Sequence, residues 1–211
     1  MTIENNQDWA NLKKYKEANQ ELIKSHSGRD RTVFIGDSIT ESWSDFSPEF
    51  FQKNNFVNRG ISGQTTPQML IRLKQDAVRL DPKMIVINAG TNDIAGNTGP
   101  STPEMIIDNI CSMAEIAIKN NIDVVLSTIL PVYKYPGNDE VVDPPKIISI
   151  INSALEEYCK KNSLSYVDYY SPMVDEKKGL KSEYGNDGVH PTKEGYDVME
   201  KAVKSVIPGT V

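Results

Sequence analysis

The sequence predicts an α/β fold in which a five-stranded parallel sheet lies between two layers of helices. Short apolar runs alternate along the 211 residues with amphipathic stretches of about helical length, and this alternation is typical of parallel strands joined by helical crossovers. The runs are apolar on consecutive residues, as expected of strands that are covered on both faces. The length suits one domain with a sizeable core.

The first half of the chain supplies three of the strands. An N-terminal helix is expected over about 8–24, because apolar residues recur at helical spacing from Trp9 to Ile23. A strand follows at 32–35 and ends at a glycine turn. A second strand, 56–58, precedes a predicted helix over 68–79, which closes before Pro82. The third strand, 84–87, is the most continuously apolar of the three.

The second half repeats this pattern. Thr102 and Pro103 supply an N-cap and a first-turn proline, which predicts a helix that continues to about residue 119. The remaining predicted strands cover 123–128 and 164–167, and the remaining helices cover 147–160 and 192–206. These elements together favour a flavodoxin-like, doubly wound three-layer sandwich, whose ligands bind beyond the carboxyl ends of the strands.

Composition excludes several classes of function. The 23 Lys and Arg against 29 Asp and Glu give a formal net charge of −6, which argues against a nucleic-acid partner. No apolar run approaches the ~20 residues of a membrane span, so stable membrane insertion is not expected. The N-terminus lacks a secretory signal, which predicts a cytoplasmic protein, or a secreted or periplasmic one if the chain is a mature form. Homo-oligomerisation is left open.

The two cysteines, Cys111 and Cys159, fall among apolar residues of predicted helices and are expected to be buried thiols. They are too few for a disulfide framework or a structural zinc site. No other pattern in the sequence calls for a metal or an organic cofactor, and we expect neither. Asp37 and Asp93 follow strands, and we expect them to bind nearby loop N–H groups rather than a metal.

A histidine base would have to be His190. The chain has two histidines, and His26 precedes the first strand, at the wrong edge of the sheet, where we expect a solvated side chain. His190 lies between a glycine turn and Pro191, just before the last helix. A neutral imidazole is the usual general base near pH 7. Asp187, three residues earlier, can hold that imidazole in one tautomer, although Asp-Gly also favours a simple turn.

Ser38 is the candidate nucleophile, because it follows the first strand at a sharp turn where a base can activate its hydroxyl. Alternatively it only caps the next helix. Acyl transfer also needs donors for the oxyanion, and three are available at neighbouring strand ends: the N–H groups of Ser38 and Gly63 and the side-chain amide of Asn92. Alternatively, Gly63 is a turn glycine and Asn92 bonds its own loop.

Four segments of the chain resemble the sequence blocks of the GDSL, or SGNH, hydrolases, in the same order. They are Gly36-Asp37-Ser38-Ile39, Gly60-Ile61-Ser62-Gly63, Gly90-Thr91-Asn92-Asp93 and Asp187-Gly188-Val189-His190-Pro191. The first block departs from the family only at Ile39, where the family has leucine. The resemblance implies a flavodoxin-like fold and hydrolysis of esters or thioesters, with Ser38, Gly63, Asn92 and His190 as the family's residues and Asp187 completing a triad.

Other catalytic patterns fit the sequence less well. The G-x-S-x-G elbow of α/β-hydrolases is absent, because Gln64 follows the nearest match at Ser62. Neither a dinucleotide fingerprint nor a phosphate loop occurs. The same fold class also serves as a binding module, but such a protein would not need Ser38 paired with His190.

The substrate is expected to be a small-molecule ester of a short acyl group, acetyl above all, which carbohydrates can carry. Trp43, Tyr133 and Tyr135 can offer rings to a sugar face, or they can all be packing residues. No amphipathic lid is evident, which weakens a lipase interpretation. Thioesterase and lysophospholipase activities stay open, because a triad does not distinguish these leaving groups.

Overall fold

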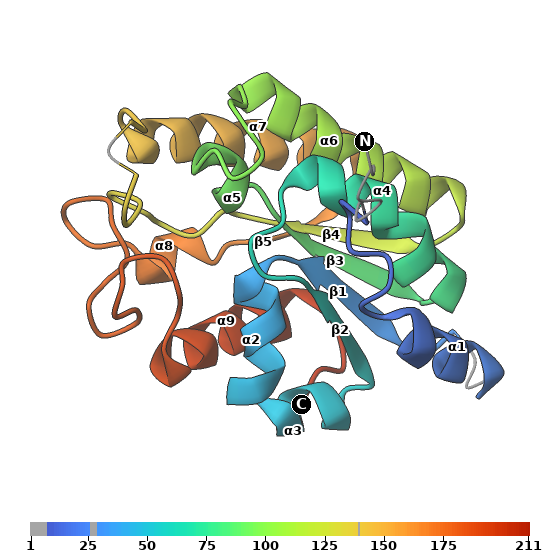
Figure 1. Ribbon diagram of the computed structural model, residues 1–211. Coiled ribbons are helices and arrows are strands. Elements are labelled where there is room, and N and C mark those ends of the chain that lie inside the picture. The colour runs from blue at the N-terminus through green and yellow to red at the C-terminus, as the bar shows by residue number, and fades with distance from the viewer. Residues whose placement is uncertain (1–7, 26–28, 139) are drawn as a thin grey trace, which may run out of the picture.

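A computed structural model describes residues 8–25, 29–138 and 140–211. His26 lies outside the described residues. The predicted parallel sheet is present, with five strands in the order β2-β1-β3-β4-β5 (Figure 1). The strands are β1 (Thr32–Gly36), β2 (Phe56–Gly60), β3 (Met84–Asn88), β4 (Asp123–Ser127) and β5 (Ser165–Val167).

The register of the central strands brings three loops together. Gly36, the last residue of β1, lies opposite Gly60 of β2 on one side and Asn88 of β3 on the other. All three strands therefore end at the same level of the sheet. The segments that follow them are close neighbours at its carboxyl edge, where the sequence predicts the site.

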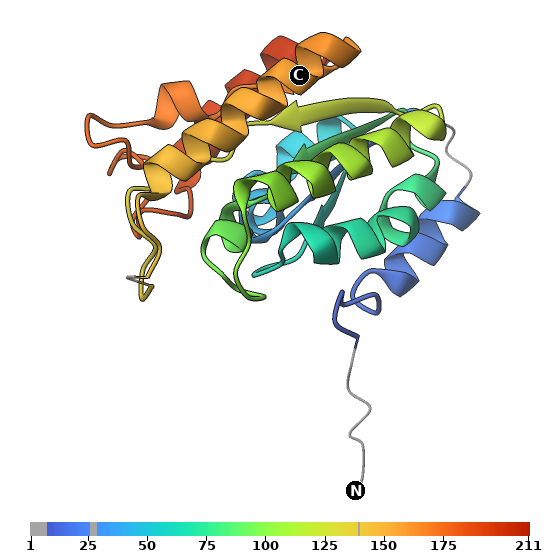
Figure 2. The same cartoon turned by 90° about the horizontal axis from the view of Figure 1, so that it is seen from above.

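Helices cover both faces of the sheet, which confirms the three-layer prediction (Figure 1). One face carries α4 (Thr66–Asp76), α6 (Pro103–Lys119) and α7 (Pro144–Asn162). The other carries α2 (Ser38–Phe46), α3 (Pro48–Lys53), α8 (Tyr170–Met173) and α9 (Lys193–Val206). Figure 2 shows α1 (Lys16–Lys24) lying outside α4, next to the short 3-10 helix η1 (Val78–Leu80). A further short helix, α5 (Thr91–Ile94), follows β3.

The core is divided between the two faces by the alternation of side chains along each strand. In β1, Val33 and Ile35 pack against the α4–α6–α7 layer, whereas Phe34 points to the other layer. Phe34 there meets Trp43 and Phe51 edge to face, with ring centroids 5.7 and 5.4 Å away. These rings fix α2 and α3 against the sheet, which in turn fixes the first turn of α2 at the sheet edge.

The N-terminal helix is shorter than predicted. It begins at Lys16 rather than near residue 8. The carboxylate of Asp8 accepts hydrogen bonds from the N–H groups of Leu12 and Lys13, and Asn11 has a φ of 53°. The apolar spacing predicts one continuous helix, but a residue in the left-handed conformation cannot lie inside an α-helix. Residues 8–15 instead form turns.

Cys159 is buried in the core and Cys111 is partly buried, and both are free thiols. Burial raises the pKa of each thiol to about 11. Among the helices that the structure describes, none is both long and apolar enough to cross a membrane.

Candidate active site

Ser38 and His190 meet at the carboxyl edge of the sheet. Ser38 is the first residue of α2, and His190 precedes α9, so the two are 152 positions apart in sequence. The Ser38 Oγ lies 2.9 Å from the His190 Nε2, within hydrogen-bond distance. Ser38 is partly exposed and His190 is exposed. The pair is therefore open to a ligand from solvent.

Asp187 orients the imidazole. Its Oδ2 lies 2.7 Å from the His190 Nδ1, while its Oδ1 accepts the N–H groups of Val189 and His190 at 2.9 and 2.8 Å. Partial burial alone would raise the pKa of this carboxyl, but these hydrogen bonds outweigh it and the pKa is lowered. An ionised carboxylate can only accept, so the proton lies on Nδ1, and Nε2 is left to accept from the Ser38 hydroxyl.

Two glycines allow α2 to approach the sheet closely enough to place Ser38 there. A Cβ on Gly36 would lie 2.0 Å from the Thr40 Oγ1, and a Cβ on Gly60 would lie 2.1 Å from the backbone N of Glu41. Asp37 caps the helix by accepting the Ile39 N–H at 2.9 Å. The nucleophile candidate thus sits on a helix start that is held by both neighbouring strand ends.

Gly63 lies in the loop after β2 and Asn92 lies in α5, and these two segments are bonded to each other. The Asn92 Nδ2 donates to the Gln64 carbonyl at 3.0 Å, and the Asn92 Oδ1 accepts from the Asn97 Nδ2 at 3.0 Å. Asn97 also donates to the Gly63 carbonyl at 3.1 Å. These bonds fix which end of the Asn92 amide carries the donors, and one of its two N–H bonds is left for a ligand.

Neighbouring backbone groups of the Gly63 loop are already bonded. The Ser62 N–H and hydroxyl both donate to the Glu41 carboxylate at 2.6 Å, and the Gln64 N–H donates to the Ile61 carbonyl. Gly63 itself has a φ of 76°, a left-handed conformation that favours glycine. Ser62 is directed to Glu41, so it is not paired with His190.

Sequence reasoning missed several residues that hold this loop, Gln64, Asn97 and Glu41 among them. A fully buried arginine, Arg72 of α4, is also part of the arrangement, because it contacts both Gln64 and Gly36. No local motif signals any of these residues.

The structure corrects the substrate-binding prediction for two aromatic residues. Trp43 is buried, stacked between Phe50 and Tyr196 at ring distances of 5.7 and 5.8 Å. Tyr135 is also buried, and its hydroxyl lies 2.9 Å from the Thr91 Oγ1. Both are packing residues and present no ring to a ligand. Tyr133 is 59% exposed, so its role stays a prediction.

The carboxylates after β1 and β3 have structural partners, in line with the interpretation from sequence. Asp93 accepts the N–H and the hydroxyl of Thr66, the latter at 2.5 Å, and burial raises its pKa. Asp37 caps α2. No cluster of three or more His, Cys, Asp or Glu that could hold a metal ion occurs within the described part of the chain.

A hydroxyl, an imidazole and a carboxylate bonded in series at the carboxyl edge of a parallel sheet are typical of serine hydrolases. Comparison with known families specifies the class further. The model of the GDSL-like lipase/acylhydrolase family matches residues 34–198, and the chain belongs to this family. A search of the curated proteins found no match.

Solved structures agree with this assignment. A GDSL-like lipase from Bacteroides thetaiotaomicron is 44% identical with a TM-score of 0.89, and the match covers 94% of this chain and 97% of that one. A proposed acylhydrolase from Bacteroides fragilis is 46% identical with a TM-score of 0.91, over 94% and 96% of the two chains. A mutant acetyl-xylooligosaccharide esterase from Geobacillus stearmophilus shares the fold, with a TM-score of 0.66 at 18% identity over 82% and 91%.

Proposed function

We propose that this GDSL-family hydrolase is a carboxylic ester hydrolase that removes short acyl groups, acetyl above all, through an acyl-serine intermediate. The observation that carries the proposal is the continuous Ser38–His190–Asp187 hydrogen-bond series, with distances of 2.9 and 2.7 Å. Such a series is what a serine hydroxyl needs in order to act as a nucleophile near neutral pH.

In the acylation step the Ser38 Oγ attacks the ester carbonyl carbon while its proton passes to the His190 Nε2. The carbonyl oxygen becomes an oxyanion, which we assign to the N–H groups of Ser38 and Gly63 and to the Asn92 amide. When the intermediate collapses, Nε2 gives its proton to the departing alcohol oxygen. Asp187 stabilises the imidazolium that exists between these two transfers.

Deacylation repeats the sequence with water. The water oxygen attacks the acyl carbon while the His190 Nε2 takes a proton from the water. His190 then gives this proton to the Ser38 Oγ as the acyl–oxygen bond breaks. The carboxylic acid leaves and the free enzyme is restored. Every proton transfer in the two steps passes through the His190 Nε2.

Two observations support the preference for acetyl. Tyr133 is the one predicted substrate aromatic whose ring is exposed, and the Geobacillus stearmophilus protein of the same fold is an acetyl-xylooligosaccharide esterase. The carbohydrate part of the proposal depends on that likeness of fold and on Tyr133.

Turnover of 4-nitrophenyl acetate by wild type and Ser38→Ala tests the chemistry. We expect Ser38→Ala to lose at least about 10³-fold in kcat, as triad nucleophiles do. Ser62→Ala is the matched control, because it removes a neighbouring hydroxyl that is bonded to Glu41, and it should lose far less. Equal rates for wild type and Ser38→Ala would remove Ser38 from the mechanism and favour a binding module.

A substrate panel tests the acyl preference. Acetyl and octanoyl esters, an acyl thioester and a lysophospholipid are compared by kcat/KM, with His190→Ala as the background. We expect the acetyl ester to be fastest. Faster turnover of the octanoyl ester, the thioester or the lysophospholipid would replace the acetyl esterase with that activity.

A further inference from the structure

A cavity of about 310 Å³ opens directly beside the imidazole of His190. Its walls come from the two elements that carry the proposed nucleophile and base, α2 and the segment leading into α9. They include Ser42 and Phe46 of α2, His190 and Pro191 of the loop, and Tyr196 of α9. Figure 1 shows α2 and α9 side by side below the sheet, and they are in contact.

The helical repeat of α2 aligns this cavity with Ser38. Ser38, Ser42 and Phe46 are spaced by four residues, so they lie on the same face of the helix, one turn after another. Ile39 and Trp43 lie about 100° and 140° round the helix from Ser38, and both are buried in the core. A ligand that is bonded to the Ser38 Oγ can therefore extend along α2 past Ser42 to the ring of Phe46.

Phe46 is an exposed ring on a rigid support. Its ring stacks on Tyr196, with centroids 5.2 Å apart and planes 28° apart, and Tyr196 stacks in turn on Trp43 at 5.8 Å and 25°. The Tyr196 hydroxyl donates to the Ile39 carbonyl at 2.9 Å, which ties the stack to the first turn of α2. Phe46 nevertheless remains 45% exposed. The stack thus presents a preformed flat apolar wall to the cavity.

The direction of proton transfer decides which part of a substrate reaches this wall. The proton that Nε2 takes from Ser38 must next pass to the oxygen of the leaving alcohol. The leaving oxygen therefore has to lie within hydrogen-bond reach of His190. The oxyanion faces the other way, toward Gly63 and Asn92. The carbon body of the alcohol therefore begins beside the imidazole, where the cavity is.

We infer that the cavity lined by Phe46, Pro191 and Tyr196 is the subsite for the leaving group, and that it takes an alcohol that carries a ring with an apolar face. This inference rests on the proposed acyl-serine chemistry and specifies its substrate. An aromatic wall stacks on the face of an aryl ring and equally on the C–H face of a pyranose.

A second cavity extends the subsite away from His190. It has a volume of about 390 Å³, lies between α3 and α9, and shares Phe46 and Lys193 with the first. Its further lining includes Phe50 and Lys204, with the Lys204 Nζ 5.8 Å from the Phe50 ring centroid. A leaving group longer than one ring has room to continue there.

Pairs of esters that differ only in the alcohol or only in the acyl group distinguish binding in this leaving-group subsite from binding of the acyl group. Ethyl acetate and 2-phenylethyl acetate share the acyl group and have alcohols of similar acidity, so their kcat/KM ratio reports the alcohol subsite. Ethyl hexanoate against ethyl acetate reports the acyl side. We expect wild type to prefer 2-phenylethyl acetate about tenfold, and Phe46→Ala to bring this ratio close to one while the hexanoate ratio stays as in wild type.

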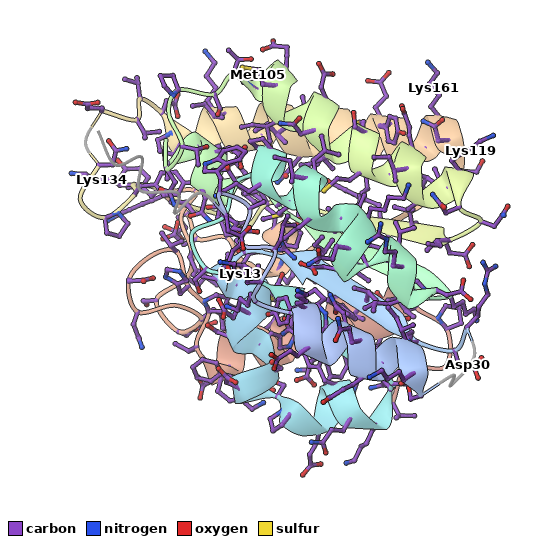
Figure 3. The ribbon with its side chains drawn as sticks, turned by 45° about the vertical axis from the view of Figure 1, so that its right-hand side comes forward. Lys13, Asp30, Met105, Lys119, Lys134 and Lys161 are labelled. Atoms are coloured by element: carbon purple, nitrogen blue, oxygen red, sulfur yellow. The ribbon has the colours of Figure 1, made fainter. Side chains whose placement is uncertain are left out.

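The ratio within each variant does not depend on the folded fraction, because both esters are measured on the same sample. Phe46→Trp keeps a flat ring and should retain the preference. Met105→Ala is the matched control, since Met105 is 52% exposed and projects from α6 in the opposite helical layer (Figure 3). Methyl glucoside acetylated on O6, assayed in the same series, shows whether a pyranose uses the subsite as well as an aryl ring.

Two results would overturn the inference while leaving the proposed function in place. One is an unchanged alcohol ratio in Phe46→Ala. The other is a change in the hexanoate ratio instead, which would make the cavity an acyl site. Absence of hydrolysis of every ester by wild type, equal to Ser38→Ala, would instead refute the proposed function, and the inference with it.

Discussion

The buried guanidinium of Arg72 donates through its Nε to the side-chain oxygen of Gln64 at 2.5 Å. A second nitrogen of the same group donates to the Gly36 carbonyl at 2.9 Å, at the end of β1 just before Ser38. The Gln64 backbone carbonyl in turn accepts from Asn92 at 3.0 Å. The Arg72 guanidinium therefore links two parts of the candidate site. One is the end of β1, which leads into Ser38, and the other is the Gln64 segment, which holds Asn92 of the proposed oxyanion site.

The Gln64 side chain is predicted to position this site. Gln64→Leu leaves the Arg72 Nε buried without its partner, and we expect it to lower the free energy of unfolding by about 3 kcal/mol and to lower kcat. Gln64→Glu keeps the acceptor for Arg72 and loses only the amide donor to the Ala10 carbonyl, so it should retain more of the stability and of kcat than Gln64→Leu. Urea unfolding and ester kinetics measure the two effects. A loss of stability with kcat unchanged in folded Gln64→Leu would make the Arg72 network structural only.

Asn92 is predicted to act on the transition state rather than on substrate binding. Asn92→Ala removes one donor from the proposed oxyanion site, and kcat should fall about 10²- to 10³-fold with little change in KM. Steady-state kinetics on an acetyl ester separate the two constants. Asn97→Ala is the comparison, because Asn97 only orients Asn92 and Gly63. A KM effect larger than the kcat effect in Asn92→Ala would contradict the assigned role.

Glycine is predicted to be required for different reasons at the end of β2 (Gly60) and in the loop that follows it (Gly63). A Cβ on Gly60 meets the Glu41 backbone N at 2.1 Å, whereas at Gly63 the nearest atom is 3.8 Å away but φ is 76°. Gly60→Ala must displace α2, so we expect it to lower the free energy of unfolding by several kcal/mol. Gly63→Ala adds only backbone strain and should lower it by about 1–2 kcal/mol. Thermal or urea unfolding measures both. A smaller loss at Gly60 than at Gly63 would be inconsistent with the close contact.

Strands β1, β3 and β4 were the most predictable, because each is a short, largely apolar run that ends at Gly36, Asn88 or Ser127. The N-terminal helix was overextended because apolar spacing alone does not reveal the left-handed Asn11. Helix α3 went unpredicted, since its six residues are too few for a periodic pattern. Local pattern thus located the sheet, while the boundaries depended on caps and on backbone conformations that the spacing does not show.

The candidate site was predictable where its residues come within a few positions of a strand end, as Ser38 and Asn92 do after β1 and β3. Trp43 was placed there because it is near Ser38 in sequence, but five residues along a helix turn it ~140° away, into the core. Arg72 shares a buried face of α4 with Met69, Leu73 and Asp76. A charged side chain is ordinarily exposed, and the burial of Arg72 is explained by the helical phase together with its partners Asp76 and Gln64.

Asp37 is a fully buried carboxyl one residue before the nucleophile candidate. Burial is the main cause that raises its pKa, to about 7, against the lowering effect of the Ile39 N–H that it accepts. In the unfolded chain the pKa returns to about 4. Between these values the unfolded state has released the proton that the folded state still holds.

The contribution of Asp37 to the free energy of unfolding should therefore fall as pH rises from about 4 to 7, by about 1.4 kcal/mol per pH unit, and stay level above. Asp37→Asn keeps an acceptor for the Ile39 N–H and cannot titrate. Its stability relative to wild type should rise across the same window, because titration of the other groups largely cancels in the difference. Urea unfolding of both proteins at half-unit pH steps measures this slope. A difference that does not change with pH would mean that Asp37 is already ionised in the folded protein, and its burial would then have to be offset by contacts stronger than the helix cap.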